Sequence, residues 1–238
     1  SIAINQRPTG LSRFKYLALT DNNDSNYVCV VCGTPLAGHV VHIFHDDEPR
    51  VLFRSPNEFP GALARHLAQG GRSLEQMPHA FAAGDRTPGD AAVGHALLAL
   101  APDLADAEGD DVDVYRYAAA LLGPDHAPAV AGLLEHDNEY VRRSAAGRLR
   151  QLGTPLATEA LRRHAREERA FAVAVVKALK AAGIDAALDQ RPGRAAVSVN
   201  SGAVWLNMDA FFRHRRTPEG LEAVVRRVRE LIALRDGR

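Results

Sequence analysis

Apolar and polar positions in the middle of the chain recur with a period of thirty residues. Gly123, Gly153 and Gly183 mark this period, and a similar pattern of apolar residues precedes each glycine. In the second copy apolar residues recur at i, i+4, i+8 and i+11, and the third copy repeats these offsets from Phe171. The stripe of the second copy consists of Val141, Ala145, Leu149 and Leu152. This self-similarity predicts stacked helical units, each ended by a glycine in the left-handed conformation.

The predicted helices of the repeat also carry start signals. Asp137 and Asn138 can cap the helix of the second copy. Pro128 and Pro155 lie near the starts of the intervening helices, where proline is tolerated. We therefore predict helical pairs over residues 113–183.

The best-matched part of this repeat resembles a known family. Residues 131–183 read AGLLEHDNEYVRRSAAGRLRQLGTPLATEALRRHAREERAFAVAVVKALKAAG, in which an aspartate turn is followed by VRRxAAxxLxxLG. This pattern resembles HEAT repeats of the short kind, and the resemblance implies a curved helical solenoid over residues 113–183. Solenoids of this kind usually bind a partner and perform no chemistry. Some enzymes of the wider family bind iron through His-Glu pairs, and this chain has no His-Glu dipeptide.

Before the repeat, the pattern changes to short runs rich in valine, isoleucine and aromatic residues. NYVCVVC, HVVHIFH and RVLFR predict three strands, with turns at GTPLAG and DDEP. A helix is expected next, because Ser55 can cap it, Pro56 suits its first position and Glu58 completes a capping box. Its predicted buried stripe is Phe59, Leu63 and Leu67.

Residues 11–68 resemble the second half of a SUKH-superfamily domain. The shared features are the run of strands, an HD pair at His45 and Asp46, and a closing SxxxF helix at Ser55 and Phe59. Many members of that superfamily are bacterial immunity proteins that neutralise toxins. The resemblance implies an incomplete SUKH-like α+β domain in residues 1–70 and an immunity or antitoxin role.

The remaining segments complete the predicted organisation. Residues 71–112 are expected to form an acidic linker with a helix near 91–100. In residues 184–238, AAVSV and AVWLNM flank Asn200 and Gly202 and predict a β-hairpin, and Thr217 is expected to cap a final helix. The predicted fold is thus an α+β N-terminal part, an all-α HEAT-like repeat and a small C-terminal ββα cap.

Charge is unevenly distributed, although 29 basic residues balance 29 acidic ones overall. Residues 85–139 hold twelve acidic against two basic residues, a balance of −10. Nuclease toxins are typically basic, so an acidic surface would steer such a partner into contact. The candidate partner-binding residues are Asp103, Asp106, Asp110, Asp111 and Asp113.

The positive charge of residues 141–182 suggests an alternative function. This segment contains ten basic and three acidic residues. A basic wall of helices could follow a phosphate backbone, although aromatic residues that stack on bases are nearly absent there. The candidate nucleic-acid-binding residues are Arg142, Arg143, Arg148, Arg150, Arg162, Arg163 and Arg166.

A second alternative is a zinc site, because both cysteines lie in one CxxC that is followed by histidines. Its four candidate ligands are Cys29, Cys32, His39 and His42. Side chains alternate along a strand, so two residues three apart face opposite sides, and we therefore favour paired strands without a metal. We find no Walker pattern and no nucleophile elbow, and no feature of either cysteine indicates a thiolate nucleophile. We expect a protein that is not an enzyme and binds no cofactor.

The amino-acid composition also indicates the cellular compartment of the protein. No run approaches the roughly 18 uncharged apolar residues of a membrane span, and the first thirty residues lack a basic head followed by an apolar stretch. Two cysteines in one CxxC fit a reducing compartment. We expect a cytoplasmic protein without a membrane partner.

Overall fold

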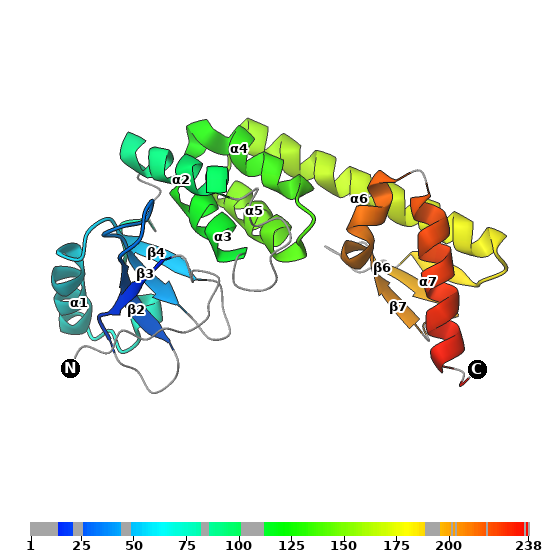
Figure 1. Cartoon of the computed structure of the whole chain (residues 1–238), viewed down its shortest axis with the longest axis horizontal. Helices are drawn as coiled ribbons and strands as arrows, with labels where there is room; N and C mark the ends of the chain where they lie inside the picture. The colour runs from blue at the N-terminus through cyan, green and yellow to red at the C-terminus, as the bar shows by residue number, and fades with distance from the viewer. Residues whose placement is uncertain are drawn as a thin grey trace. The chain divides into compact units, whose positions relative to one another are not determined.

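The computed structural model describes residues 14–20, 26–43, 49–81, 86–100, 112–188, 196–200, 202, 204–217, 219–235 and 237. The chain divides into two compact units, residues 1–157 and 158–238. Figure 1 shows the elements of both units, and each unit is described in turn.

The first unit contains an antiparallel sheet of four strands in the order β1-β2-β3-β4. The strands are β1 (Tyr16–Ala18), β2 (Tyr27–Val31), β3 (Val40–Ile43) and β4 (Arg50–Phe53) (Figure 1). The pattern of valines predicted β2, β3 and β4, and the sheet confirms them. Strand β1, which has only three residues and pairs with β2, was not predicted.

Helices cover both faces of this sheet. One face packs Cys29, Val31 and Val41 against helices α2 (Pro88–Leu100) and α3 (Val112–Leu121), and Leu97 and Tyr117 of those helices are fully buried. The opposite face packs against α1 (Glu58–Ala68), followed by the short 3-10 helix η1 (Leu74–Gln76). Residues expected to form a linker and the first repeat therefore share a core with the sheet.

Helix α1 buries only part of the predicted stripe. Phe59 is buried and Leu63 is partly buried against the same core, whereas Leu67 is 59% exposed and Ala62 and His66 are buried in addition. The Ser55 hydroxyl accepts from the Asn57 N–H, and the helix begins at Glu58 without a side-chain cap. The stripe is shifted because His66 turns inward and bonds its Nε2 to the Ser73 carbonyl, at 2.9 Å.

The helices after α3 match the second copy of the repeat well. The elements η4 (Pro124–His126), α4 (Ala127–Gly132) and η5 (Leu133–Glu135) lead to α5 (Glu139–Leu152). The Asn138 side chain accepts from the Tyr140 N–H at 2.9 Å, which confirms the predicted cap. The predicted glycine caps are left-handed at Gly153 (φ 61°) and Gly183 (φ 78°), and the one at Gly123 is wrong, since its φ is −86°.

The third copy does not form the helical pair that a solenoid requires. Helix α6 (Pro155–Ala181) is a single helix of 27 residues, where the repeat predicts two helices joined by a turn. Residues 161–171 include no buried side chain. No glycine, proline or capping residue occurs between Glu159 and Ala182, so nothing in this segment ends the helix. The structure therefore shows a run of helices and does not confirm a HEAT-like solenoid.

The second unit ends in a small sheet and a helix. Strands β5 (Ala186–Leu188), β6 (Ala196–Val199) and β7 (Val204–Asn207) are antiparallel, and η6 (Met208–Arg216) leads to α7 (Gly220–Arg235). The predicted hairpin is confirmed, and β5 corrects the expected ββα element to three strands and a helix. The apolar core of this unit includes Val175, Leu179, Val197, Leu206, Val224 and Val228. No helix of the described residues is long and apolar enough to cross a membrane.

Candidate functional site

The two cysteines have different environments. Cys29 lies inside β2 and is 4% exposed, whereas Cys32 follows the strand and is exposed. Burial raises the pKa of the Cys29 thiol to about 12. At neutral pH the side chain is therefore a thiol, which is neither a good metal ligand nor a good nucleophile.

The histidines of the predicted metal set do not meet Cys29. His42 pairs with Val28 across β2 and β3, so it lies on the α1 face of the sheet, opposite to Cys29. His39 contacts the Leu36 carbonyl through its Nδ1 at 3.2 Å, and burial lowers its pKa. The four candidate ligands are not brought together. The described part of the chain holds no group of three or more His, Cys, Asp or Glu placed to bind a metal. The HD pair, His45 and Asp46, lies outside the described residues.

Four of the five residues predicted for the acidic partner site, Asp103, Asp106, Asp110 and Asp111, lie outside the described residues. Asp113, in the first turn of α3, bonds Arg116 at 2.8 Å, and its side chain is 14% exposed. Exposed acidic side chains occur instead in the segment between α3 and α5, at Asp125, Glu135 and Asp137.

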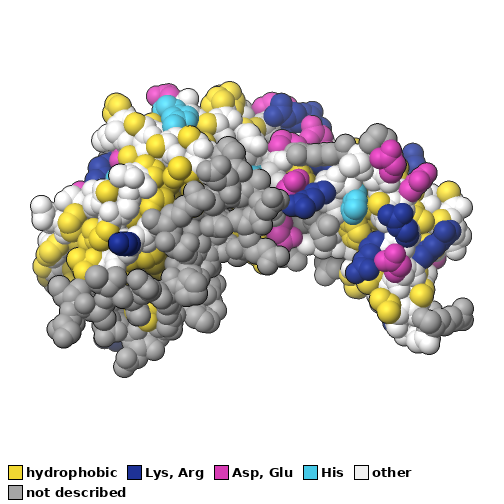
Figure 2. Space-filling view, in the orientation of Figure 1, with side chains coloured by type: hydrophobic (Ala, Val, Ile, Leu, Met, Phe, Trp, Pro, Cys, Tyr) yellow, Lys and Arg dark blue, Asp and Glu magenta, His cyan; other side chains and the backbone are white. Residues whose placement is uncertain are grey.

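The seven candidate arginines divide into two groups. Arg142 and Arg148 are buried, and both donate to backbone carbonyls, so they do not contribute to an exposed surface. The exposed members are Arg143, Arg150, Arg162, Arg163 and Arg166. Two of these contact carboxylates: Arg143 lies 3.6 Å from Glu139, and Arg166 lies 2.7 Å from Glu159. On the face that Figure 2 shows, basic and acidic side chains of the second unit are interspersed.

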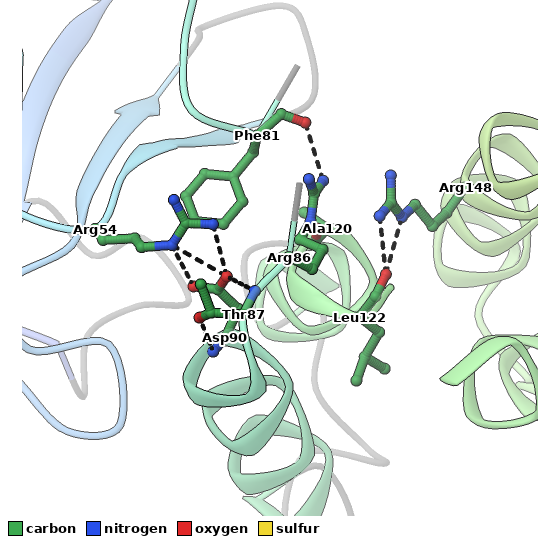
Figure 3. Close-up of polar contacts among 8 residues, drawn as sticks. All are labelled: Arg54, Phe81, Arg86, Thr87, Asp90, Ala120, Leu122 and Arg148. Atoms are coloured by element: carbon green, nitrogen blue, oxygen red, sulfur yellow. Dashed lines mark hydrogen bonds and ion pairs between the residues drawn. The ribbon is translucent and has the colours of Figure 1, made fainter. Parts of the chain in front are cut away.

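The first unit also has a partly buried polar junction, centred on Asp90, that was not predicted from the sequence. At the end of β4, Arg54 makes a bidentate contact with Asp90, with Nε and Nη2 at 2.9 Å from Oδ1 and 2.7 Å from Oδ2 (Figure 3). Asp90 is 2% exposed and also accepts from the Thr87 N–H, while Thr87 Oγ1 accepts from the Asp90 N–H. This reciprocal pair caps α2. Burial alone would raise the pKa of Asp90, but the Arg54 and Thr87 hydrogen bonds outweigh it and hold the pKa below its usual value.

Two further arginines of this junction satisfy the end of α3. The Nε of Arg86 donates to the Ala120 carbonyl at 2.8 Å, and Nη2 of Arg148 donates to the Leu122 carbonyl at 2.8 Å (Figure 3). They replace the left-handed cap that was expected at Gly123, where an added Cβ would lie 3.3 Å from the Arg86 side chain. Phe81 lies between Arg54 and Arg86, with both guanidinium carbons within 5 Å of its ring centroid, at 4.8 and 4.9 Å. The junction is thus built to hold the sheet and helices together.

One part of this junction, the cap of α2, could have been predicted from the sequence. The stretch Thr87-Pro88-Gly89-Asp90 has the spacing of a helix cap. The partner Arg54 lies 36 residues away, and no local pattern indicates it.

Comparisons with known proteins give no relative from which a function could be carried over. No protein-family model matches the chain, and no curated protein or solved structure matches it either.

Proposed function

We propose that this protein is a non-enzymatic interaction protein of the immunity or antitoxin kind, which binds and masks a basic partner protein through its first unit. The observation that carries the proposal is charge. The first unit holds 19 acidic and 13 basic residues, a net charge of −6. Such an excess accelerates the encounter with a basic protein and disfavours nucleic acid.

The placement of four arginines of the first unit supports this proposal. Arg86, Arg142 and Arg148 direct their guanidinium groups to backbone carbonyls, and Arg54 pairs with Asp90. These cations are therefore committed to internal contacts. Asp125, Glu135 and Asp137 remain exposed between α3 and α5.

The fold of the first unit is compatible with the resemblance that suggested the role. Three strands followed by a short helix, β2-β3-β4-α1, have the order implied for a SUKH-like domain. This order supports the proposal only at the level of fold, because fold alone does not determine function.

Affinity capture with the full-length chain tests the proposal. Lysate of the host organism is treated with nuclease, and bound proteins are identified by mass spectrometry. We expect one stoichiometric basic protein that elutes as salt is raised. The charge-reversed variant D125K/E135K/D137K should lose this protein, whereas R162E/R163E, reversed in the second unit, should keep it. Equal capture by both variants would contradict an acidic binding surface in the described part of the first unit.

A second candidate function is nucleic-acid binding by the second unit. This unit holds 16 basic and 10 acidic residues, a net charge of +6, and Arg162 and Arg163 on α6 are exposed. If this candidate is correct, the full-length chain binds single- or double-stranded oligonucleotides with an affinity that falls steeply as salt rises. R162E/R163E should then weaken binding, and D125K/E135K/D137K should not.

A further inference from the structure

Two surface histidines from different elements of the first unit meet at their ring nitrogens. His95 lies in α2 with an exposed side chain, and His126 is the last residue of η4. The Nε2 atom of His95 lies 3.0 Å from the Nδ1 atom of His126. The ring centroids are 4.9 Å apart and the ring planes cross at 71°, so the rings meet edge to face.

The backbones that carry the two histidines are fixed by packing. Gly94, next to His95, lets α2 approach the end of α3 so closely that a Cβ there would lie 3.1 Å from the Leu122 side chain. The His126 N–H donates to the Gly123 carbonyl at 3.0 Å, which places η4 directly after that segment. The arginine bonds to Ala120 and Leu122 hold the same segment in place. The fold therefore holds the two backbone segments that carry these imidazoles close together.

We propose that His95 and His126 bind one divalent late transition-metal ion, such as Cu²⁺, Ni²⁺ or Zn²⁺, through Nε2 and Nδ1 respectively. Imidazole is a preferred ligand of these ions. Two nitrogens bound to one ion at about 2.0–2.1 Å lie about 2.9 Å apart at a right angle and about 3.3 Å apart at the tetrahedral angle. The observed 3.0 Å falls between these values and is closest to the right angle of tetragonal Cu²⁺ or Ni²⁺.

Proton placement follows from this geometry. Without metal, one ring donates its N–H to the other across the 3.0 Å contact. With metal, both facing nitrogens give lone pairs to the ion, so His95 carries its hydrogen on Nδ1 and His126 on Nε2. The described residues supply no third ligand, so water completes the coordination shell at this exposed position. Protons compete for the same nitrogens, and binding therefore weakens as pH falls.

Calorimetric titration of the untagged full-length chain with NiCl₂ tests the site. We expect one Ni²⁺ per chain, and an affinity at least about tenfold weaker in H95A and in H126A, because the second imidazole binds intramolecularly. H214A is the matched control, since His214 is a partly exposed histidine of η6, and it should bind as the wild type does. Circular dichroism verifies that each variant folds, and H95Q and H126Q serve as a second pair of variants.

The variant C32S, titrated in the same way, tests whether Ni²⁺ binds at the CxxC segment instead of at the two histidines. The proposal predicts that C32S keeps the Ni²⁺ affinity of the wild type. A wild-type chain that binds no Ni²⁺, or H95A and H126A variants that bind it as tightly as the wild type, would overturn the proposal. Electron paramagnetic resonance of the Cu²⁺ complex gives an independent readout, with two nitrogen ligands expected in the wild type and one in each single variant.

Discussion

The first and second units differ in what they bury. Every buried polar or charged side chain of the described residues lies in the first unit: His39, His42, His66, Asp90, Arg142 and Arg148. The described core of the second unit consists of apolar side chains, and ion pairs such as Arg227–Glu230 and Arg166–Glu159 lie at its surface. The stability of the first unit should therefore depend more strongly on single polar contacts, and that of the second more strongly on apolar packing.

This difference shows how a short, irregular set of helices can still be tied to a sheet. The sheet and helices of the first unit pack through their apolar faces, and they also meet at loops and helix ends, where unpaired backbone groups must be satisfied. Guanidinium groups reach several acceptors at once and perform this task at the end of α3. In the second unit the corresponding contact, from Arg229 to the Ala182 carbonyl after α6, is exposed and longer, at 3.4 Å.

The largest effect is expected for Asp90→Ala. It leaves Arg54 without its carboxylate and removes the cap of α2, so the first unit should lose about 3–5 kcal/mol of unfolding free energy. Urea denaturation followed by circular dichroism reports both units, whereas the fluorescence of Trp205, the single tryptophan, reports the second unit. The fluorescence transition should stay in place. Glu230→Ala, which removes an exposed ion pair, should cost about 0.5 kcal/mol or less.

Leu179→Ala should produce the reverse pattern. Leu179 is fully buried in the core of the second unit, and its truncation should cost about 3 kcal/mol through lost burial and a cavity. The Trp205 transition should shift to lower urea. If only the circular dichroism transition moved, the second unit would not have the independent apolar core described here.

Arg148→Leu should have an intermediate effect on the first unit. Burial, with Arg86 nearby, lowers the pKa of Arg148 to about 10, so the side chain is charged at neutral pH and bonded to the Leu122 carbonyl. Leucine leaves this carbonyl without its donor, at a cost of about 2 kcal/mol. Arg150→Leu on the same helix is the control, because Arg150 is exposed and its replacement should change stability by about 0.5 kcal/mol or less.

Gly153→Ala should cost about 1 kcal/mol. Gly153 has φ 61° and ends α5 with a bond from its N–H to the Leu149 carbonyl, and an alanine adopts this conformation with strain. Gly147→Ala, inside the same helix and with open space around it, should instead be neutral or stabilising. Thermal unfolding of the two variants measures the contrast.

The smallest effect is expected from mild acid. The pKa of Asp90 is lowered in the folded state, so its contribution to stability is present above the unfolded value of about pH 4 and is lost as pH falls through the folded pKa. Down to about pH 4 the first unit should therefore keep this contribution, and below it should lose stability faster than the second unit. Asp90→Asn should flatten this dependence, and an unchanged acid profile in that variant would contradict the role given to the Asp90 carboxylate.

The sequence predicted elements better than it predicted how they end and meet. Asn138 and Gly153 cap the helix next to them in the sequence, so the neighbouring residues were sufficient to predict both caps. The structure confirms them. The third copy repeats the apolar stripe, but no residue between Glu159 and Ala182 stops a helix, and α6 continues through this stretch. Here the similarity between copies was misleading, because a shared stripe indicates a buried face and says nothing about a turn.

The candidate functional residues could not be chosen correctly from the sequence, because their environment depends on contacts with residues far away in the chain. Arg142 and Arg148 looked like exposed cations of a helix, yet both bond to carbonyls outside their own helix. The polar junction joins Arg54 to a residue 36 positions away, and the histidine pair joins residues 31 positions apart. Such pairs follow from the packing of the sheet and helices, which periodicity alone does not determine.

The most direct test of the proposed masking role is growth of cells that express the captured partner. If the partner arrests growth, co-expression of the full-length chain should restore it. D125K/E135K/D137K should fail to restore growth, whereas R162E/R163E should succeed. A partner that is harmless by itself, or an arrest that the wild-type chain leaves unchanged, would contradict the account.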